Sequence, residues 1–525
     1  MAEGRAATGR IIAIFVSLIV LLTAVALYAP RYRKPAAVVL PASSILRMLP
    51  TVEVWVSTAD HRLKLAPQSD IALTARGTDD ADVVVDLATR HQVMDGFGAS
   101  MTDASAWLIK NRMSAQQRRD LLNELYGQPP NLNMNTMRLT IGSSDFSLNV
   151  YTLDDMPFGQ TDESLRHFTA APNLDYLIPV VRQALSVNPG LLIVSSSWTA
   201  PAWMKANENL LGGELNPQYY EAYADYLAKY VDVYRSHGIP IFALTLQNEP
   251  LYSPVSYPGM VMDPATRIAV IKLLGPKLAA RTAKTRILEW DHNWAVPAQP
   301  LAVLADPGAA KYVDGVAWHC YEGSPYEQGK VHRAHPDKDT YITECTGGDW
   351  PLDMNGELLW FSRNLLVTGT RQWARGVIYW NLALDERHGP QFGGCRLCKG
   401  LITINSQTGE VTRNDEYYAI AHFSRFVEPG AVRVKSTDTD ADKHIANVAF
   451  QNSTDGSIVM VMVNINKHTR RVSVAQGNQS FAYDMPAESV ATFVWNQAPA
   501  ATWVRRALLW LNKGRNPGVE AAYGP

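Results

Sequence analysis

Two glutamates in this sequence lie where a carboxyl group could take part in a reaction. Glu249 comes shortly after the apolar run 241–246 and beside Asn248, and Glu344 directly follows the β-branched run 340–343. Two carboxyl groups in different environments can supply a proton to a leaving oxygen and an anion to a cationic carbon. Cleavage of a glycosidic bond needs both, and carboxyl groups about 5–5.5 Å apart retain the sugar's configuration. We therefore expect Glu249 and Glu344 to form the pair of catalytic carboxyl groups of a retaining hydrolase.

Polar residues follow other apolar runs in the same way. Helix-like stretches separate these runs. The runs with the pattern of β-strands are 94–98, 134–141, 191–195, 241–246, 286–290, 315–318, 340–343 and 376–380. Eight parallel strands alternating with helices close a (β/α)8 TIM barrel, which carries its site at the mouth formed by the carboxyl ends of the strands. We therefore predict an α/β fold with the catalytic barrel over residues 91–425.

One helix of this barrel has clear start and stop signals. Asn216 is the expected N-cap, Pro217 stands at the first helical position, and Gly238 ends the segment. Apolar and aromatic residues recur at helical spacing between them. The run 241–246 then follows as a buried strand.

Both flanks of the barrel have a different pattern. Val52, Val54 and Val56 alternate with polar residues, and a polar turn leads to residues 62–65, which predicts a hairpin. Residues 432–497 have the same strand-like pattern, with apolar runs at 458–463 and 490–495. Strands at both ends of the chain predict a side β-sandwich formed from residues 51–90 and 426–497.

The N-terminus has the features of an export signal. Arg5 and Arg10 precede the uncharged, apolar run 11–29, and residues 31–50 are rich in Pro, Ala and Ser. We predict a signal peptide or a signal anchor over residues 1–30 and a linker over residues 31–50. The bulk of the chain is then exported, either secreted or anchored through residues 11–29 and facing the periplasm or exterior. The C-terminal tail 498–525 contains a short amphipathic stretch, which we expect to dock on the protein, with a membrane surface as the alternative.

The composition narrows the range of partners. The net charge is −2 over 525 residues, and the body of the chain has no Lys/Arg-rich stripe, so no nucleic-acid partner is expected. Four histidines, His292, His319, His332 and His335, lack the spacing of common zinc motifs, and we expect no metal and no cofactor. Fourteen Trp and 22 Tyr can provide aromatic faces for sugar rings.

The four cysteines leave two alternatives open. Cys395 and Cys398 form a CxxC pair without a second CxxC, which favours a local disulfide or a packed pair of thiols over zinc. Cys320 and Cys345 complete the set. An export signal makes disulfides chemically permissible.

Several motifs together resemble glycoside hydrolase family 30, which includes glucosylceramidases, β-xylosidases, β-glucanases and xylanases. They are DGFGASMTD (95–103), SWTAPAWMK (197–205), LQNEP (246–250), TEC (343–345) and WNLAL (380–384). The resemblance extends in order from about residue 52 to 497. It implies a barrel with a side β-sandwich, no metal, and a double displacement through a covalent glycosyl-enzyme.

The resemblance also implies roles around the two carboxyl groups. Glu249 matches the acid/base and Glu344 the nucleophile of the family. Tyr321 would lie against the nucleophile. Arg138 would lie beneath it as a fixed cation that keeps the Glu344 carboxylate ionised.

Further residues are implied to bind the substrate. Asp145 would bind hydroxyls of the sugar in the −1 subsite, and Trp198 and Trp380 would form the walls of that subsite. Asn248 would hold the 2-hydroxyl. His319, which follows the sixth predicted strand, is also expected to contact the sugar.

Two departures from the lysosomal glucosylceramidase leave the aglycone open. Residues 393–400 read GGCRLCKG, and Cys320 stands where that enzyme has tryptophan. The expected function is a retaining hydrolase of a β-linked sugar or glycoconjugate, of the β-glucosidase, β-glucanase, β-xylosidase or glucosylceramidase type. The alternative is a catalytically inactive, membrane-tethered carbohydrate-binding protein.

Overall fold

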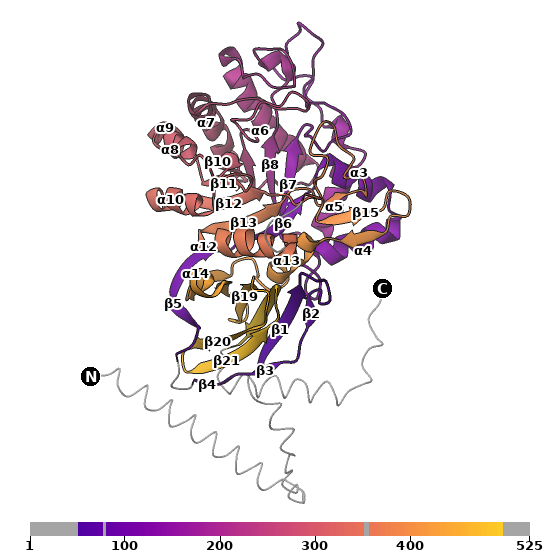
Figure 1. Cartoon of the computed structure of the whole chain (residues 1–525). Coiled ribbons are helices and arrows are strands. Elements are labelled where there is room, and N and C mark those ends of the chain that lie inside the picture. Colours follow the sequence, from indigo (N-terminus) through magenta and orange to yellow (C-terminus); the bar gives the residue numbers. More distant parts are fainter. Residues whose placement is uncertain (1–50, 77–79, 351–355, 497–525) are drawn as a thin grey trace, which may run out of the picture. The chain divides into compact units, whose positions relative to one another are not determined.

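The computed structural model of the protein describes residues 51–76, 80–350 and 356–496 (Figure 1). The predictions for residues 1–30, 31–50 and 498–525 lie outside the described residues and stay predictions. Within the described ranges, no helix combines the length and the apolar character needed to cross a bilayer.

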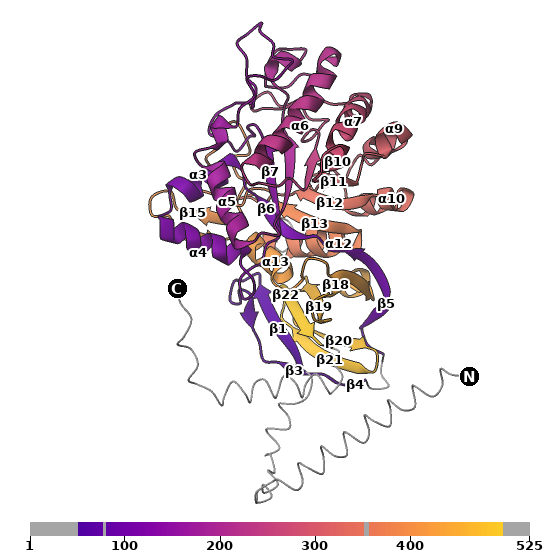
Figure 2. The same cartoon turned by 180° about the vertical axis from the view of Figure 1, so that it is seen from behind.

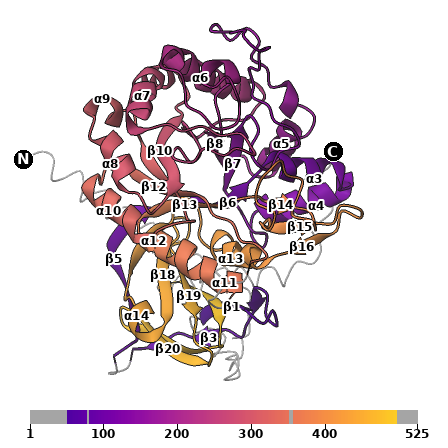
Figure 3. The same cartoon turned by 45° about the horizontal axis from the view of Figure 1, so that its top comes forward.

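Eight parallel strands form a closed barrel, with helices arranged around them (Figure 3). In chain order the strands are β6 (Gly96–Ser100), β7 (Thr136–Ile141), β8 (Leu192–Ser197), β9 (Ala243–Thr245), β10 (Arg286–Asn293), β11 (Gly315–His319), β12 (Asp339–Glu344) and β13 (Ala374–Tyr379). Each overlaps one predicted run, so the predicted (β/α)8 barrel is confirmed. β10 extends beyond its predicted end at residue 290 because His292 and Asn293 still pair with β11 after a register shift.

Helices connect the strands. They are α3 (Asp103–Asn111), α4 (Ala115–Tyr126), α5 (Leu177–Val187), α6 (Tyr220–Ser236), α7 (Pro264–Ala279), α8 (Ala298–Leu304), α9 (Pro307–Ala310), α10 (Tyr326–Ala334), α11 (Gly356–Trp360), α12 (Gly369–Arg371) and α13 (Asp415–Ser424). A π-helical segment, η4 (Phe361–Thr368), joins α11 to α12, and a small sheet of β14 (Ala383–Leu384), β15 (Ile402–Ile404) and β16 (Val411–Arg413) follows β13.

The predicted helix after Asn216 differs in its first turn. The Asn216 side chain accepts a hydrogen bond from the Gln218 backbone N–H (3.2 Å), as an N-cap should, but it caps the 3-10 helix η3 (Pro217–Tyr219). The α-helix α6 begins only at Tyr220. The tighter first turn makes i→i+3 hydrogen bonds, a common way for a helix terminus to satisfy its backbone groups.

The barrel interior changes character along its axis. One buried layer is apolar and is formed by residues from six different strands: Val194, Ala243, Leu288, Ala317, Tyr341 and Ile378. Toward the carboxyl ends of the strands the interior becomes polar, with buried Arg138, Asp291 and His319. The apolar layer therefore supports a polar layer at the mouth.

The second sheet combines strands from both ends of the described chain, as predicted (Figure 2). Its order is β2 (Ala66–Pro67), β1 (Thr51–Thr58), β22 (Ser489–Trp495), β19 (Ile458–Asn464), β18 (Ile445–Gln451), β17 (Val432–Ser436), β5 (Val83–Val93), β20 (Arg470–Gln476), β21 (Gln479–Met485) and β4 (Thr74–Ala75), with β3 (Ile71–Ala72) beside β1. The short helix α14 (Asp440–Lys443) precedes β18. β5 extends across the predicted boundary at residue 90.

The predicted hairpin after β1 forms, but its second strand is β2 (Ala66–Pro67) rather than residues 62–65. Residues 62–65 form no strand, and β1 pairs with β2 at Trp55 and Val56 and along most of its length with β22. Leu65 has a φ of +47°, and its backbone N–H donates to the Ser57 hydroxyl (2.8 Å). This left-handed conformation interrupts the extended chain, which the apolar alternation alone could not indicate.

The long apolar run of β19 is explained by burial on both faces. Val459, Val461 and Val463 belong to the core shared with the barrel, whereas Ile458, Met460 and Met462 belong to the core within the sandwich. Alternate side chains of a strand point to opposite faces, so two cores require a continuous apolar sequence. The barrel and the sandwich are thus held together by a common core.

A buried histidine connects the two domains. His422 on α13 contacts the hydroxyls of Thr492 on β22 (2.8 Å) and Ser57 on β1 (2.9 Å). Burial lowers the pKa of His422 to about 3, so the ring is neutral in the folded protein near neutral pH.

We predict that His422→Leu destabilises the protein at pH 7.5 by about 1–3 kcal/mol, because two buried hydroxyls lose a partner. The pKa of His422 is lower in the folded than in the unfolded chain, so its neutral form stabilises the fold above pH 6.5, and this contribution is lost as the pH falls toward 3. The stability difference between wild type and variant, measured by urea unfolding, should therefore shrink below pH 6.5. A difference that does not change with pH would contradict this account.

Candidate active site

A buried arginine lies at the centre of the polar layer. Arg138 on β7 has no exposed surface, and burial of its side chain is offset by two nearby carboxylates that raise its pKa. Its guanidinium donates hydrogen bonds to Glu344 Oε2 (2.5 Å), Asn248 Oδ1 (2.7 Å) and Asp291 Oδ2 (2.9 Å). The planar, permanently charged fork can hold several oxygens in fixed positions. One cation thus connects residues that follow or end three other strands.

Asp291 is the second fixed point of this layer. Burial raises its pKa, but the Arg138 charge and the His319 hydrogen bond outweigh burial and hold the pKa well below its usual range. Three hydroxyls from other strands of the barrel also donate to it at 2.6 Å: those of Ser196, Thr245 and Thr343. Asp291 is therefore a buried carboxylate whose acceptor sites are occupied by the protein.

His319 lies between the carboxyl groups. Its Nδ1 is 3.2 Å from Glu249 Oε1, and its Nε2 is 3.1 Å from Asp291 Oδ1. Burial lowers the pKa of His319, but the Glu344 charge and hydrogen bonds to Asp291 and Glu249 raise it to about 9. At neutral pH the ring is therefore an imidazolium that donates from both nitrogens.

The two candidate catalytic carboxyl groups are close together. One oxygen of Glu249, one oxygen of Glu344 and one ring nitrogen of His319 lie within 4.8 Å of one another. Glu344 is held at both oxygens, because Arg138 binds Oε2 and the Tyr321 hydroxyl donates to Oε1 (2.8 Å). The separation is close to the roughly 5–5.5 Å of retaining pairs and much shorter than the roughly 6.5–9.5 Å of inverting pairs.

Glu249 has a different environment. Burial raises the pKa of Glu249. The hydrogen bond from His319 and the positive charge of the His319 ring outweigh burial, so that the pKa is lowered. The Glu249 backbone N–H donates to the Asp291 carbonyl (3.0 Å), which fixes the loop that follows β9. The two carboxyl groups therefore differ in their partners: an imidazolium for Glu249, and an arginine with a tyrosine for Glu344.

Strained backbone is concentrated around this layer. Glu249, Trp290, Asp291 and Asn381 have φ values of +47°, +80°, +60° and +30°. Non-glycine residues in such conformations cost about 1–3 kcal/mol each and persist only where the surroundings determine them. Here the hydrogen bonds of Asp291 and Glu249 provide that constraint.

A cavity of about 570 Å³ opens over the carboxyl groups, within the usual range of roughly 300–1,000 Å³ for ligand sites. Its lining is rich in aromatic and carboxylate side chains. The lining residues are Asp145, Glu249, Leu251, Tyr252, Tyr257, Trp290, His292, Asn293, Val296, Tyr321, Glu322, Glu344, Thr346, Trp350, Trp380, Cys395 and Cys398. Apolar faces with a few polar groups suit a sugar, which stacks by its ring and hydrogen-bonds by its hydroxyls.

The predicted substrate residues occupy two positions relative to this cavity. Asp145, Tyr321 and Trp380 line it. Trp198 is buried and stacks on Trp380, with ring centroids 5.1 Å apart and an interplanar angle of 20°. Asn248, whose Oδ1 accepts from Arg138, is also nearly buried, so its amide NH2 is the group left to donate.

Asp145 has an unusual environment for a carboxyl group. Burial and the charge of Glu344 raise its pKa well above the usual range. Gly394, from the GGCRLCKG stretch, lies directly against it, because a Cβ on Gly394 would come within 2.8 Å of the Asp145 Cβ. The Asp145 carboxyl can therefore act as a hydrogen-bond donor as well as an acceptor.

Two residues of the site were not predicted. Asp291 and His292 directly follow the predicted strand 286–290, but the sequence alone assigns no role to them. Asp291 proves to be the carboxylate shared by Arg138 and His319, and His292 lines the cavity with its Nε2 3.9 Å from Glu249 Oε1. The one sequence feature that indicates a role in the site is their position directly after an apolar run.

The histidines give no argument for a metal. His332 lies on α10, where its ring stacks on Trp373 at 4.3 Å, and His335 caps that helix. His319, Glu249 and Glu344 have donor atoms close enough for a shared ion, but a protonated imidazole has no lone pair for a metal. The donor set thus suits proton chemistry rather than metal binding.

All four cysteines form disulfides. Cys395 pairs with Cys398, which decides between the two predicted alternatives, and both line the cavity. Cys320 pairs with Cys345, a bond that the sequence analysis did not predict. The two cysteines are 25 residues apart in the sequence, which does not indicate that they pair. They meet because the adjacent strands β11 and β12 end side by side in the barrel.

A TIM barrel that carries two converging carboxyl groups and an aromatic cavity at its mouth defines the class of the protein as a glycoside hydrolase. The chain belongs to glycosyl hydrolase family 30. Residues 94–427 match the family's TIM-barrel domain and residues 430–493 match its beta sandwich domain.

Three comparisons show the range of its relatives. The chain is 34% identical to an endo-1,6-beta-D-glucanase of Neurospora crassa, over 82% of this chain and 92% of that one. It is 28% identical to the lysosomal acid glucosylceramidase of Mus musculus, over 78% and 82% of the two chains. A solved structure of an endo-beta1,6-glucanase superposes with a TM-score of 0.77 at 31% identity, covering 85% of this chain and all of that one. These relatives place the protein among β-glycoside hydrolases.

We predict that His319→Gln lowers the free energy of unfolding by about 3 kcal/mol near neutral pH, because the variant loses the stabilisation that corresponds to the raised pKa of the buried ring. The pKa is higher in the folded than in the unfolded chain, so the full contribution is present below pH 6.5 and is lost as the pH rises through 9. Urea unfolding of wild type and variant between pH 6 and 10 measures this. If the difference grew with rising pH instead, the charged state assigned to His319 would be wrong.

Proposed function

We propose that the protein is a retaining, endo-acting β-glucanase, which cleaves internal bonds of β-1,6-linked glucan. Glu344 attacks the anomeric carbon while Glu249 protonates the leaving oxygen, and water activated by Glu249 then releases the sugar from Glu344. The observation that carries this proposal is the separation of the two carboxyl groups, whose nearest donor atoms lie within 4.8 Å. Carboxyl groups of inverting enzymes lie about 6.5–9.5 Å apart, which leaves room for the attacking water.

The assignment of the two roles rests on their partners. A nucleophilic carboxylate must be ionised and held in a fixed orientation. Glu344 meets this requirement because Arg138 binds one of its oxygens and Tyr321 binds the other. An acid/base must exchange a proton during the cycle, and Glu249 contacts the ionisable His319 and is more exposed than Glu344. Formation of the glycosyl-enzyme neutralises Glu344, which removes a nearby negative charge and lowers the pKa of Glu249 as its role changes from acid to base.

The substrate class rests on the relatives and on the cavity. The relatives with the highest identities named above are endo-1,6-β-glucanases, and the site's open cavity of about 570 Å³ offers aromatic side chains beyond the carboxyl groups, including Tyr252 and Tyr257. A glucan chain needs such contacts on both sides of the cleaved bond. The glucosylceramidase relatives have lower identity, and ceramide is the competing aglycone.

Export of the chain is part of this proposal. Residues 11–29 support a signal peptide or a membrane anchor. The two disulfides fit an oxidising compartment, where such bonds persist. A glucan outside the cell would be accessible to a secreted or an anchored enzyme.

We predict distinct effects of the two carboxamide variants. Glu344→Gln should abolish formation of the glycosyl-enzyme with every substrate. Glu249→Gln should lose about 10²–10⁴-fold in kcat on glucan but retain attack on aryl β-glucosides with very good leaving groups, which need little protonation. Steady-state and burst kinetics measure both, with Glu327→Gln on α10 as a control that keeps full activity.

Equal and complete loss in both variants on every substrate would contradict these roles. The stereochemistry provides an independent check, because the first product seen by proton NMR should be the β-anomer. An α-anomer as the first product would require an inverting mechanism.

The substrate proposal is tested with a panel of β-linked compounds. We predict that linear β-1,6-glucan is cleaved with at least a tenfold higher kcat/KM than β-1,3-glucan, β-1,4-xylan or detergent-dispersed glucosylceramide, and that oligosaccharides appear before glucose in chromatograms. Release of glucose alone would indicate exo cleavage, and faster cleavage of glucosylceramide would overturn the glucan assignment. No turnover of any compound would favour the carbohydrate-binding alternative.

A further inference from the structure

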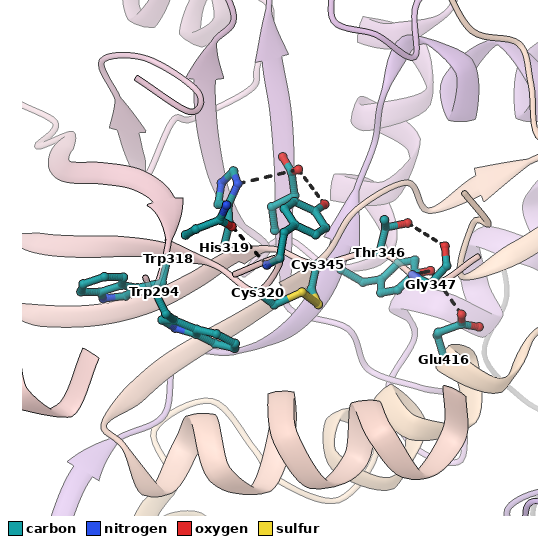
Figure 4. The surroundings of a disulfide bond; sticks show 12 residues. Trp294, Trp318, His319, Cys320, Cys345, Thr346, Gly347 and Glu416 are labelled. Atoms are coloured by element: carbon teal, nitrogen blue, oxygen red, sulfur yellow. Dashed lines mark hydrogen bonds and ion pairs between the residues drawn. A yellow bond between two sulfur atoms is a disulfide. The ribbon is translucent and has the colours of Figure 1, made fainter. Parts of the chain in front are cut away.

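The disulfide between Cys320 and Cys345 lies next to the catalytic layer. Cys320 is the first residue after β11 and Cys345 is the first residue after β12, with their Cα atoms 5.3 Å apart. Both are buried, and Figure 4 shows the bond between His319 on one side and Thr346 on the other. It is thus a covalent link between two adjacent strand ends at the mouth of the barrel.

The neighbours of each cysteine in sequence are the residues that meet in the site. Cys320 stands between His319 and Tyr321, and Cys345 directly follows Glu344. The Tyr321 hydroxyl donates to Glu344 Oε1 at 2.8 Å, and the His319 ring lies 3.8 Å from the same oxygen. The disulfide therefore joins the backbones that carry both ends of these contacts.

Backbone pairing between the two strands is irregular at this point. Trp318 pairs with Ile342, but the next pair is His319 with Glu344, so that Thr343 is skipped. Beyond this pair the ladder ends. Such a bulge re-aims side chains but weakens the local pairing. The disulfide provides a fixed separation where hydrogen bonds between the strands no longer do.

The link also reaches the wall of the cavity. The carbonyl oxygen of Cys345 accepts a hydrogen bond from the backbone N–H of Trp380 (2.8 Å), the first residue after β13. Movement of Cys345 would therefore displace Trp380 as well as Glu344. Cys345 thus contacts the residues that directly follow β11 and β13.

We propose that Cys320 and Cys345 are positioning residues for catalysis: their disulfide holds Glu344 at the distance from Tyr321 and His319 that nucleophilic attack requires. This inference rests on the proposed function of Glu344. A displacement of about 1 Å at a reacting group can cost about 10²-fold in rate. The expected loss is therefore in kcat rather than in substrate affinity.

The test compares two disulfide-deletion variants. Cys320→Ala/Cys345→Ala should lower kcat on the best substrate of the panel by about 10–100-fold, with KM changed less than threefold, and should shift the pH profile of kcat, because the contact of Glu344 with His319 is loosened. Cys395→Ala/Cys398→Ala removes the disulfide that lines the cavity, so its main effect should be on KM. Both are assayed well below their melting temperatures, after circular dichroism has confirmed the fold.

A variant that folds with unchanged kcat and unchanged pH profile would overturn the inference. Lack of turnover by the wild type would instead refute the proposed function, so the two failures are distinguishable. If the Cys320→Ala/Cys345→Ala protein does not fold, the Cys395→Ala/Cys398→Ala protein is treated with a phosphine reductant, which leaves one disulfide to reduce. The loss of kcat should then follow the appearance of two thiols and reverse on reoxidation, and two thiols with undiminished kcat would overturn the inference.

Discussion

The buried ionic contacts of Arg138 are the constraint on which the site depends. One guanidinium binds Glu344, Asp291 and Asn248, and its carbon also lies 4.9 Å from the centre of the Trp198 ring. Removal of one partner from a buried ion pair typically costs about 3–5 kcal/mol, because the remaining charge has no compensation. The network is therefore stable only when all of its members are present. This requires Arg138 on β7, Asp291 on β10 and Glu344 at the end of β12 to lie at one level of the barrel.

The rest of the fold supplies that alignment. An apolar layer inside the barrel fixes the strands below the polar layer, and the sandwich adds a core shared with the outer surface of the barrel. The strained backbone at Glu249 and Asp291 shows that local conformational preference has been overridden at the mouth. Stability from two cores thus sustains a strained, highly charged layer that would be unfavourable by itself.

The sequence predicted the fold class and the carboxyl pair because both depend on short patterns. Apolar runs with polar residues at their ends identified all eight barrel strands, and the alternation of Val52, Val54 and Val56 identified β1. The sequence could not show that β1 pairs along most of its length with β22 and only at two residues with β2, because pairing of distant strands is a non-local property. For the same reason it did not reveal the Cys320–Cys345 bond or the sharing of Asp291 by Arg138 and His319, which depend on residues far apart in the chain.

In the mechanism we propose, the carboxylate held by Arg138 and Tyr321 forms the covalent bond to the sugar. The most direct measurement is mass spectrometry of the intact enzyme and its peptides after brief exposure to an activated 2-deoxy-2-fluoro β-glucoside, which slows release of the covalent intermediate. The account predicts one added glycosyl mass per chain, located on the peptide that contains Glu344. An adduct on the peptide that contains Glu249, or turnover of the probe with no adduct at any time, would contradict it.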